Sequence, residues 1–592
     1  MRLADYIASL VAAHGVTDFF TVTGGGAMHL NDAFARNKQL RGICLHHEQA
    51  CTMAAEAYCR LSGRLALVNV TTGPGGINAL NGVHGAWTDS IGMLVISGQV
   101  KQETMATSYD LPLRQLGDQE ADIVSMARGI TKFATVLRNK EDVRYVVEKA
   151  IHLALTGRPG PVWIDVPMDI QGAQIEPDTL RGYVPEAHDA LPNIAEIAEI
   201  LRNARRPVIM PGTGVRIAGA YDAFLKLVEL TGFPVATAFN AHDLLPEGHS
   251  SYVGRPGTVG DRAGNFAVQN ADVVLILGCR LNIRQISYNW ENFAPDALKI
   301  MVDIDQAELS KPTLDIQKAV CADLKDFIPA LVQALGNFVP SEDQNRYLAW
   351  CQERHRLHPV MRPEYEDDTQ GVNPYFFADN LSDAASGNDV IVTANATACV
   401  TTFQTAKIKP GQRMFSNSGS ASMGYDLPAA IGAAIAAPER RVICLSGDGS
   451  FMMNMQELQS IIAMGLNIKI FLLNNDGYSS IKQTQRAFFP DNMFGCDASN
   501  GVTFPNFCRV AAAFGFEPRR VTAHAALSQT IAETLASPGP QFCEVVLNPM
   551  QVFAPKLSSR KLDDGRMVSS PLHDMAPFLS REELAKNMWS NT

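Results

Sequence analysis

Short apolar segments that alternate with helical periodicity are the feature of this sequence that most restricts its fold. The pattern occurs in three separate regions of the 592-residue chain, and the apolar segments are rich in Val, Ile and Leu. Strands that alternate with helices form open parallel sheets, because a parallel connection needs a crossover of helix length. A chain this long also exceeds what one hydrophobic core can organise. We therefore predict an α/β protein with three doubly wound parallel-sheet domains.

The strand candidates fall into three groups. They are residues 18–22, 65–70, 92–97 and 161–166, then 206–210, 272–277 and 299–304, then 389–393, 441–446, 467–473 and 542–547. Polar, proline-containing stretches at 171–195 and 338–374 separate the groups, and we place the domain boundaries there. The expected units are domains at 1–180, 190–340 and 370–550 and a C-terminal tail at 551–592. The tail is rich in Pro, Ser and charge, and we expect it to pack over a neighbouring site as a lid or arm.

Composition excludes several other classes of protein. Hydrophobic residues make up 46% of the chain and charged residues 19%, as in ordinary globular proteins. The sequence has no apolar run of the roughly 18 residues that a membrane span needs, and Asp5 interrupts the N-terminal segment where a signal peptide would be apolar. Eleven cysteines without a C-x-x-C pair favour reduced thiols. The formal charge of -11 argues against nucleic-acid binding, and we expect a cytoplasmic protein without nucleic-acid or membrane partners.

The stretch "SGDGSFMMN" at 446–454 places a carboxylate between two glycines directly after an apolar strand. Asn454 and Glu457 have the spacing of a capping box, and Gly465 stands where the following helix is expected to end. The next strand, "NIKIFLLNN", ends at Asn475. Since the two strands of such a unit are parallel, Asp448 and Asn475 are expected side by side at the carboxyl edge of the sheet, where open α/β folds bind ligands.

One carboxylate and one carboxamide oxygen are ligands that suit Mg²⁺, which completes its shell with water and phosphate oxygens. Gly447 and Gly449 leave room for a diphosphate to approach the backbone, and the start of a helix favours anions. Taken alone, G-D-G is more often a simple turn. Together with the asparagine pair across a complete strand-helix-strand unit, it predicts a metal that holds a diphosphate.

G-D-G followed after 24 residues by N-N resembles the thiamine diphosphate motif shared by acetolactate synthases, pyruvate decarboxylases and their relatives. The resemblance implies that the side chains of Asp448 and Asn475 and the backbone carbonyl of Gly477 bind Mg²⁺. It also implies cofactor contacts for their neighbours, which are Gly447, Gly449, Ser450 and Tyr478.

The segment "CLHHEQACTMAAEAYCRLSGR" at 44–64 resembles the family's R-H-E-Q-x-A-x-x-A-A-x-G-Y-A-R segment. This resemblance makes Glu48 the catalytic glutamate, hydrogen-bonded to N1′ of the aminopyrimidine so that the cofactor itself can take the proton from thiazolium C2. A lone glutamate on a helix is otherwise usually a solvated charge. His46 and His47 are equally compatible with a structural role and with a substrate contact.

Two other segments of the first region resemble the acetolactate synthase branch. "GVTDFFTVTGGGAMHLNDAF" at 15–34 implies that Gly25 turns its N–H toward a reacting carbonyl oxygen, with Gly24 beside the cofactor. The alternative for these glycines is a flexible loop. "GDQEADIVSMARGITK" at 117–132 places Gln119 near substrate and cofactor. The pattern continues through 71–100, which adds Thr72 to the expected cofactor contacts.

In the third region, "NSGSASMGYDLPAAIGAA" at 417–434 resembles the segment whose bulky apolar side chain wedges between the two cofactor rings. Met423 takes that position, although a methionine is otherwise most often plain core. Asn395 and Thr397 stand where acetolactate synthases have G-Q-H, and both can still donate hydrogen bonds to phosphate.

Other positions depart from acetolactate synthases. Thr484 replaces a tryptophan that biases those enzymes toward a larger ketoacid acceptor, Met168 replaces a lysine, and Asp118 replaces a phenylalanine. The acceptor pocket is therefore expected to differ. Three other features look more like a side branch of acetolactate-synthase-like enzymes: the H-H-E-Q variant, the loop "SYDLPLRQLGDQEADIV" at 108–124 and the tail stretch "PLHDMAPFL" at 571–579. Members of that branch move a two-carbon acyl unit onto a ketosugar, or join pyruvate-derived acyl units to ketones and diketones.

The middle region keeps residues that match FAD-contacting positions of acetolactate synthases, where the flavin is structural. Glycines can admit a diphosphate, arginines can pair with it, and a strand-end aspartate can bind ribose. The matching residues are Arg158, Gly212, Gly214, Arg280, Arg284, Asp303 and Asp323. The sequence departs from the pattern at Asn282 and Ile283, so the alternative is a vestigial or ADP-binding domain.

We predict a thiamine diphosphate- and Mg²⁺-dependent carboligase that decarboxylates pyruvate or a related 2-ketoacid and transfers the two-carbon unit to a ketone, diketone, ketosugar or second ketoacid. The alternative with the same cofactor is a simple decarboxylase or C–C bond hydrolase. A flavin or nicotinamide oxidoreductase would need G-x-G-x-x-G after a strand, which "GTGVRIAG" imitates weakly. By resemblance the active sites lie between subunits of a homodimer or homotetramer.

Overall fold

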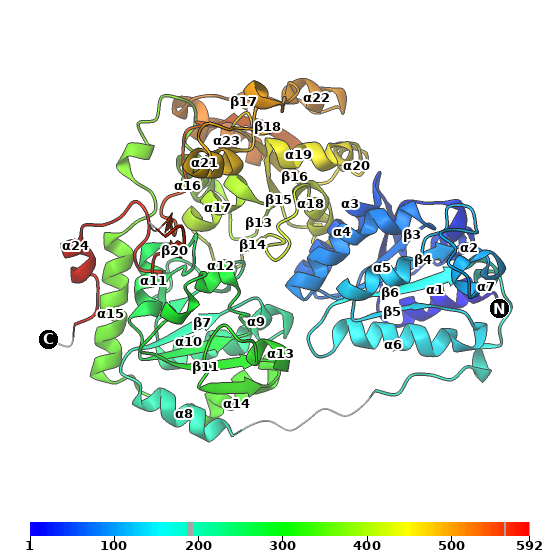
Figure 1. The fold of residues 1–592 in the computed structure, drawn as a ribbon, viewed down its shortest axis with the longest axis horizontal. Helices are drawn as coiled ribbons and strands as arrows, with labels where there is room; N and C mark the ends of the chain where they lie inside the picture. The colour runs from blue at the N-terminus through cyan, green and yellow to red at the C-terminus, as the bar shows by residue number, and fades with distance from the viewer. Residues whose placement is uncertain (186–192, 562–563, 591–592) are drawn as a thin grey trace.

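Three six-stranded parallel sheets form the framework of the protein, which confirms the predicted α/β class. The structure is a computed structural model and describes residues 1–185, 193–561 and 564–590. In Figure 1 the first sheet and its helices (blue and cyan) lie to one side, the central unit (green) lies beside them, and the third unit (yellow to orange) lies above both. The red C-terminal tail runs against the central unit.

The first sheet has the strand order β2-β1-β3-β4-β6-β5. Its strands are β1 (Asp18–Thr21), β2 (Arg41–Cys44), β3 (Leu67–Val70), β4 (Met93–Gln99), β5 (Phe133–Val136) and β6 (Pro161–Pro167). The helices of this unit are α1 (Leu3–Ala13), α2 (Met28–Arg36), α3 (Glu48–Ser62), α4 (Pro74–Asp89), α5 (Ile123–Ala127), α6 (Val143–Leu155) and α7 (Met168–Gln171).

The central sheet has the order β12-β11-β10-β7-β8-β9. Its strands are β7 (Pro207–Pro211), β8 (Val235–Ala236), β9 (Tyr252–Gly254), β10 (Val273–Leu277), β11 (Leu298–Asp303) and β12 (Lys318–Cys321). The helices are α8 (Ile194–Asn203), α9 (Gly214–Ile217), α10 (Tyr221–Thr231), α11 (Arg262–Gln269), α12 (Ile283–Ile286), α13 (Gln306–Leu309), α14 (Leu324–Leu335) and α15 (Glu342–Leu357).

The third sheet has the order β14-β13-β15-β16-β18-β17. Its strands are β13 (Val390–Thr393), β14 (Arg413–Phe415), β15 (Val442–Gly447), β16 (Ile468–Asn474), β17 (Arg519–Val521) and β18 (Gln541–Val546). The helices are α16 (Pro374–Ala384), α17 (Ala396–Thr405), α18 (Asp426–Ala436), α19 (Asp448–Asn454), α20 (Leu458–Ala463), α21 (Ser479–Phe488), α22 (Phe507–Ala513) and α23 (Leu527–Ala536). The tail adds the hairpin β19 (Ser559–Lys561) and β20 (Met567–Ser569) and the helix α24 (Arg581–Lys586).

The first and third sheets have the same topology. If the strands of each are numbered from one to six in chain order, both read 2-1-3-4-6-5. Helices α3 and α18 follow the second strand of their sheets, so they are equivalent elements, and they pack against each other. The approach is close, because an ideal Cβ at Gly432 of α18 would lie 1.9 Å from the carbonyl oxygen of Ala54 in α3.

The two predicted boundary stretches differ in structure. Residues 338–374 contain the long helix α15, whose capping box is formed by Ser341 and Gln344 and whose Tyr347 hydroxyl donates to the Ala267 carbonyl at 2.6 Å. This stretch is therefore partly a component of the central unit. The other boundary, 171–195, includes residues 186–192, which lie outside the described residues.

The described part of the tail lies on the central unit. The Leu557 N–H donates to the Thr258 carbonyl at 2.7 Å, and the Arg262 guanidinium donates to the carbonyls of Met575 and Pro577. Within the described residues, none of the helices has the length and apolar character that crossing a bilayer requires. The eleven cysteines all belong to the described residues, and all are free thiols.

Candidate active site

Asp448 and Asn475 lie side by side at the carboxyl edge of the third sheet, as predicted. Strands β15 and β16 pair in parallel up to Gly447 and Leu473. The Asp448 carboxylate is 3% exposed and accepts hydrogen bonds from the backbone N–H groups of Gly449 (2.7 Å), Gly477 (3.0 Å) and Asn475 (3.2 Å). Burial raises the pKa of Asp448 to about 6, although the three N–H groups favour the ionised form.

The Asn475 side chain has the arrangement expected of a metal ligand. Its Nδ2 donates to Thr397 Oγ1 at 3.4 Å, while its Oδ1 is buried and has no hydrogen-bond donor among the described residues. A buried carbonyl oxygen without a donor is rare unless a ligand satisfies it. Together with the neighbouring carboxylate it provides hard oxygen atoms of the kind that Mg²⁺ binds. The residues present therefore fit the expected cation.

Gly477 must be glycine in this arrangement. Its φ angle is +145°, and an ideal Cβ would lie 2.4 Å from the carbonyl oxygen of Cys496. A side chain here would move the loop that brings the Gly477 N–H to Asp448.

Other predicted residues of the third unit surround the same loop. Around Gly449, an ideal Cβ would meet Tyr478 Cε1 at 2.1 Å and Met423 Cε at 3.2 Å. Ser450 Oγ accepts from the Gly424 N–H at 2.8 Å, and Asn395 Nδ2 donates to the Ala421 carbonyl at 3.1 Å. The structure therefore brings the predicted cofactor contacts of this unit together.

The expected capping box at Asn454 and Glu457 is wrong. The helix begins earlier, at Asp448, and α19 ends at Asn454, where a short 3-10 turn follows before α20. The two side chains serve tertiary contacts instead: Asn454 Nδ2 donates to the Gly424 carbonyl at 2.7 Å, and Glu457 accepts from the His46 N–H at 3.0 Å.

Glu48 is the first residue of α3, and its half-buried carboxylate faces α4. Asn78 Nδ2 donates to Glu48 Oε2 at 3.0 Å, and an ideal Cβ at Gly75 would lie 3.3 Å from Oε1. Among the described residues, no hydrogen bond or ion pair connects Glu48 with Asp448 or Asn475 in the same chain. Glu48 Oε1 is left without a hydrogen-bond donor of the described part of the chain.

His47 has a structural position. It is the N-cap of α3, and its Nδ1 accepts from the Gln49 N–H at 3.0 Å, which fixes the first turn where Glu48 stands. His46 is exposed and is held through its backbone by Glu457.

Gly24, Gly25 and Thr72 lie at the carboxyl edge of the first sheet, next to Glu48. Thr71 Oγ1 accepts from the Gly26 N–H at 3.1 Å, and an ideal Cβ at Gly24 would meet the Thr71 side chain at 2.5 Å. A Cβ at Gly25 would meet nothing within 4 Å, so Gly25 faces open space. The buried Thr72 Oγ1 has no partner among the described residues.

Gln119 is exposed at the same edge, on a loop with a tight backbone contact. Its φ is +59°, and an ideal Cβ at Gly73 would lie 1.8 Å from the Gln119 carbonyl oxygen. The next residue, Glu120, holds the loop: its carboxylate accepts from the N–H groups of Ala106 (2.6 Å), Leu116 (2.9 Å) and Gly117 (3.0 Å).

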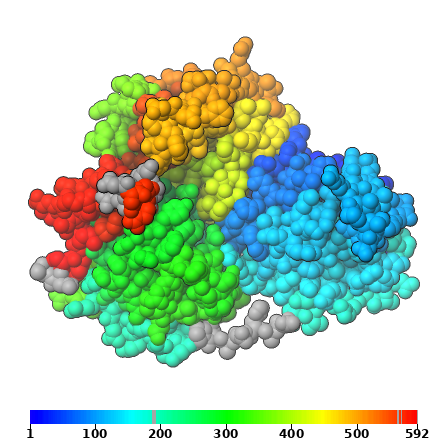
Figure 2. Space-filling view, viewed as in Figure 1, coloured from blue at the N-terminus to red at the C-terminus, as the bar shows by residue number. Residues whose placement is uncertain are grey.

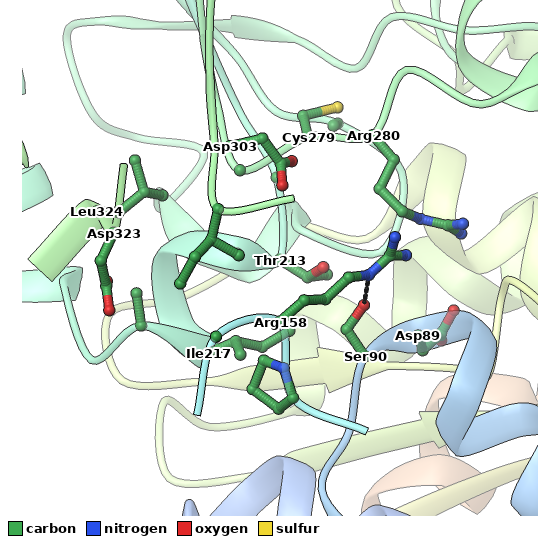
Figure 3. Close-up of a pocket in the computed structure, with 18 of the residues that line it drawn as sticks. Asp89, Ser90, Arg158, Thr213, Ile217, Cys279, Arg280, Asp303, Asp323 and Leu324 are labelled. Carbon is green, nitrogen blue, oxygen red and sulfur yellow. Dashed lines mark hydrogen bonds between the residues drawn. The ribbon is translucent and has the colours of Figure 1, made fainter. Parts of the chain in front are cut away.

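The surfaces of the three units adjoin one another in Figure 2. A cavity of about 880 Å³ lies where the three units meet (Figure 3). Its lining includes six of the seven residues predicted to contact a flavin nucleotide, which are Arg158, Gly212, Gly214, Arg280, Asp303 and Asp323. Asp89 and Ser90 of the first unit and Ser418 of the third also line it. Arg284 is not among the lining residues, and its guanidinium stacks on the ring of Phe239, 4.9 Å from the centroid.

The two arginines of the cavity differ in their partners. Arg158 Nη1 pairs with Asp305 (2.8 Å) and Glu308 (2.9 Å), and its Nε donates to Ser90 Oγ at 2.9 Å, as Figure 3 shows. Burial disfavours the charged form, but the two carboxylates keep the pKa of Arg158 above its ordinary value. The Arg280 guanidinium makes no hydrogen bond or ion pair with any residue that the structure describes, so it is free to meet an anion.

The glycines of this cavity are required by the protein itself. An ideal Cβ at Gly212 would lie 2.3 Å from the Gly278 carbonyl oxygen, and one at Gly214 would lie 2.7 Å from the Gly278 Cα. The turns after β7 and β10 therefore touch through their backbones, which leaves the cavity open between them.

Comparison with known families shows which family the chain belongs to. Residues 1–126 match the thiamine pyrophosphate enzyme N-terminal TPP binding domain, residues 194–331 the central domain, and residues 396–545 the C-terminal TPP binding domain. The chain belongs to the thiamine pyrophosphate enzyme family. The resemblance noted in the sequence is thereby confirmed, and the first and third units match domains described as binding thiamine pyrophosphate.

Within the thiamine pyrophosphate enzymes, this protein is acetolactate synthase-like. It is 32% identical to acetolactate synthase 1 of Nicotiana tabacum over 574 residues, which cover 94% of this chain and 83% of the relative. It is also 32% identical to the large subunit of acetolactate synthase isozyme 1 of Escherichia coli over 563 residues, 93% of this chain and 95% of the relative. The Arabidopsis thaliana acetolactate synthase is 30% identical over 568 residues.

Sequence reasoning missed several residues that hold the predicted ones in this thiamine pyrophosphate enzyme. Asn78 contacts Glu48, Glu120 fixes the Gln119 loop, and Asp89 lines the central cavity. Glu120 carried a usable signal, because it adjoins Gln119 in the segment already singled out. Asn78 contacts Glu48 across two helices of the first unit, and Asp89 contacts the other two units, so no local pattern marks either residue.

Proposed function

We propose that this protein is a thiamine diphosphate- and Mg²⁺-dependent carboligase that decarboxylates pyruvate and adds the two-carbon unit to a second carbonyl compound. The observation that supports it most is the pairing of the Asp448 carboxylate with the unsatisfied, buried Asn475 Oδ1. The relatives named above are acetolactate synthases, which favours a second ketoacid as one acceptor. Thiamine diphosphate, when bound, supplies a nucleophilic thiazolium carbon that can attack a 2-ketoacid.

The roles of the chain's own residues follow from their positions. Asp448, Asn475 and the Gly477 carbonyl would hold the cation and through it the diphosphate, with Asn395 and Thr397 beside it. Glu48 Oε1 would accept a hydrogen bond from the cofactor, while Asn78 holds Oε2. Gly25 would offer its N–H to a substrate oxygen and Gln119 would orient the substrate. Met423, beside Tyr478 and Gly449, would support the conformation of the bound cofactor.

The decisive experiment for the metal pair is Asp448→Ala. We expect this variant to lose Mg²⁺-dependent retention of thiamine diphosphate, measured by gel filtration and cofactor assay with Mg²⁺ or with chelator. Asp389→Ala is the matched control. Asp389 is about as buried as Asp448, but it is ion-paired with Arg441 and stands at the opposite end of the third sheet. Unchanged retention in Asp448→Ala with chelator present would contradict the proposal.

We further propose that the acceptor range is broader than that of acetolactate synthases and includes ketones, diketones or ketosugars. Thr484 on α21 supports this proposal. Its hydroxyl donates to the Ser480 carbonyl at 3.1 Å, and its side chain occupies less space than the tryptophan of acetolactate synthases would. Labelled pyruvate should be incubated with a panel of these acceptors. Acetolactate as the sole product would rule out the broader range, and free aldehyde or acid would favour the decarboxylase or hydrolase alternative.

The central cavity is proposed to hold FAD in a structural role. Its volume suits a nucleotide of this size, the Arg280 guanidinium is available for the diphosphate, and Asp303 stands at the end of β11, where a ribose can be bound. Burial raises the pKa of Asp303, which suits a carboxyl group that exchanges hydrogen bonds with a hydroxyl. The visible spectrum of the purified protein tests for flavin, and titration with ADP tests the nucleotide alternative.

Localisation and assembly are also proposals. The free thiols are compatible with the reducing cytoplasm. The unused Oε1 of Glu48, which has no partner in the diphosphate-binding unit of its own chain, is the observation that favours an active site completed by a second copy.

A further inference from the structure

Helix α4 contacts both the predicted catalytic carboxylate and the segment that carries Met423. Asn78 donates to Glu48 at 3.0 Å, and one turn later Asn81 Oδ1 accepts from Ser422 Oγ at 2.8 Å. Farther along, His84 Nδ1 lies 3.1 Å from Ser420 Oγ, and the last residue, Asp89, accepts from the Gly419 N–H at 2.9 Å. A single helix therefore connects Glu48 with residues 417–424, which we call the Met423 segment.

Asp89 is the buried end of this connection. Its carboxylate is held by the Arg60 guanidinium at 2.7 Å, and Arg60 also pairs with Glu56 of the same helix α3. Glu56 in turn accepts from the hydroxyl of Tyr425, which directly follows the Met423 segment. Both ends of the segment are thus attached to one buried group of charges in the first unit.

The contact between Asp89 and Gly419 leaves no spare room. An ideal Cβ at Gly419 would lie 2.5 Å from Asp89 Oδ1, so only glycine allows this approach. Asn240 of the central unit reaches the same carboxylate at 3.5 Å and donates to the Ser416 carbonyl at 2.8 Å. Asp89 is consequently in contact with all three units.

Asp89 also lines the central cavity (Figure 3). Ser418, which immediately precedes Gly419, lines it as well. Its neighbour Ser90 accepts from Arg158, which lines the same cavity. A ligand in the cavity therefore contacts the wall to which the Met423 segment is bonded.

We propose that Asp89 is a positioning residue through which occupancy of the central cavity sets the place of the Met423 segment and strengthens thiamine diphosphate binding. The inference rests on the proposed function, because it takes FAD as the cavity ligand and Met423 as a cofactor contact. Coupling of two sites is reciprocal, so each ligand should raise the affinity for the other by the same factor, typically about fivefold or more.

The experiment uses full-length enzyme stripped of both cofactors and compares it with Asp89→Asn. Asparagine has only one side-chain oxygen to accept the hydrogen bonds of Arg60 and the Gly419 N–H. Its NH2 group must therefore face one of these two donors, and that contact is lost. We expect saturating FAD to lower the dissociation constant of thiamine diphosphate about fivefold or more in the native chain and to leave it unchanged in the variant. Proton exchange at thiazolium C2, followed by NMR with FAD present, should be roughly tenfold slower or more in Asp89→Asn.

Gly419→Ala removes the same contact from the other side and keeps the proposal testable if Asp89→Asn does not fold. Asp389→Asn is the control, because it breaks a buried ion pair with Arg441 and is expected to lower the melting temperature without changing C2 proton exchange.

The outcomes separate the inference from the proposed function. FAD that binds without changing the affinity for thiamine diphosphate in the native chain would overturn the inference and leave the proposed function standing. Failure of FAD to bind would refute the flavin proposal and overturn the inference with it, and would leave the thiamine diphosphate proposal standing. If FAD binds, C2 exchange decides the role of Asp89. A normal exchange rate in both Asp89→Asn and Gly419→Ala would overturn it, and slowed exchange with an unchanged melting temperature would support it.

Discussion

At the scale of single residues, the active site depends on carboxylates whose surroundings differ. Asp448 is buried and accepts three backbone N–H groups, which suits a group that stays in place and binds a cation. Glu48 is half-buried at a helix start, with one oxygen held by Asn78 and the other unused. The first arrangement fixes a charge, and the second leaves an oxygen available to a ligand.

The substitution Glu48→Gln tests this difference. The glutamine side chain keeps the size of the native one but replaces one acceptor oxygen with a donor group, so C2 proton exchange should fall by about 10² to 10⁴. The affinity for thiamine diphosphate should change only slightly, because Asp448 and Asn475 hold its other end. NMR-monitored exchange and a cofactor titration measure the two effects.

The matched control is Glu148→Gln. Glu148 is partly buried and paired with Arg144 at 2.9 Å on α6, away from the sheet edges that carry the site. Native exchange in Glu48→Gln, or an equal loss in Glu148→Gln, would show that Glu48 does not have the role proposed here.

At the scale of elements, every predicted strand is present, and the strands that sequence reasoning missed share a property. In the three six-stranded sheets the missed strands are β2, β5, β8, β9, β12, β14 and β17, and all except β8 are at the edge of a sheet. The tail hairpin of β19 and β20 was not predicted either. Edge strands face solvent on one side, so they lack the continuous apolar run of central strands. β2, for example, buries only one of its four residues, whereas all seven residues of β4 are buried. β8 has two residues, too few for any pattern.

Prediction from the sequence was also only partly successful for the candidate site. Asp448 and Asn475 were predictable because both follow buried strands whose pairing is dictated by a short crossover. The early start of α19 was not, because Asn454 and Glu457 have a capping pattern but make tertiary contacts with Gly424 and His46 instead. Contacts between distant segments compete with local capping, and only the packed structure shows which prevails.

Strand β6 contains a buried acid, Asp165, which contacts side chains of β4 and whose titration should affect stability. Burial raises the pKa of Asp165 to about 7, although Ser97 (2.5 Å) and Gln99 (2.9 Å) donate to its carboxylate. In the unfolded chain the pKa is about 4, so between these values the native state binds the proton more tightly. The native state therefore loses stability as the pH rises from about 4 to about 7.

We expect the difference in unfolding free energy between the native chain and Asp165→Asn to shift by about 2 to 3 kcal/mol in favour of the variant from pH 5 to pH 8. Urea unfolding at several pH values measures it. A difference that is independent of pH would show that Asp165 is ionised throughout this range.

The contact between α3 and α18 gives a second prediction for elements. Gly432→Ala places a methyl group against the Ala54 carbonyl, so it should destabilise the protein by roughly 1 to 3 kcal/mol. Gly129→Ala is the control, since a Cβ there meets nothing within 4 Å. Thermal unfolding of both variants tests this, and equal melting temperatures would mean that the two helices separate readily.

At the scale of the whole molecule, the position of Glu48 bears on how many chains form one site. If Glu48 serves the cofactor held by Asp448 of a second copy, then two inactive variants should complement each other. A dimer of Glu48→Gln and Asp448→Ala chains contains one site with both native residues and one with neither.

Mixing the two variants after dissociation, or expressing them together, should therefore restore roughly a quarter of native activity when the chains pair at random. Activity assays on the separated and mixed proteins measure this. Persistent inactivity of a verified mixed dimer would place the whole site within one chain.

The matching strand orders of the first and third sheets have a consequence for the origin of the protein. Two units of the same topology that meet through equivalent helices have the geometry of a self-associating pair, the kind formed by two copies of one polypeptide. Duplication and fusion of an ancestral gene would place such a pair on a single chain. Each half could then specialise: Glu48 lies in the first unit, and Asp448 and Asn475 lie in the third.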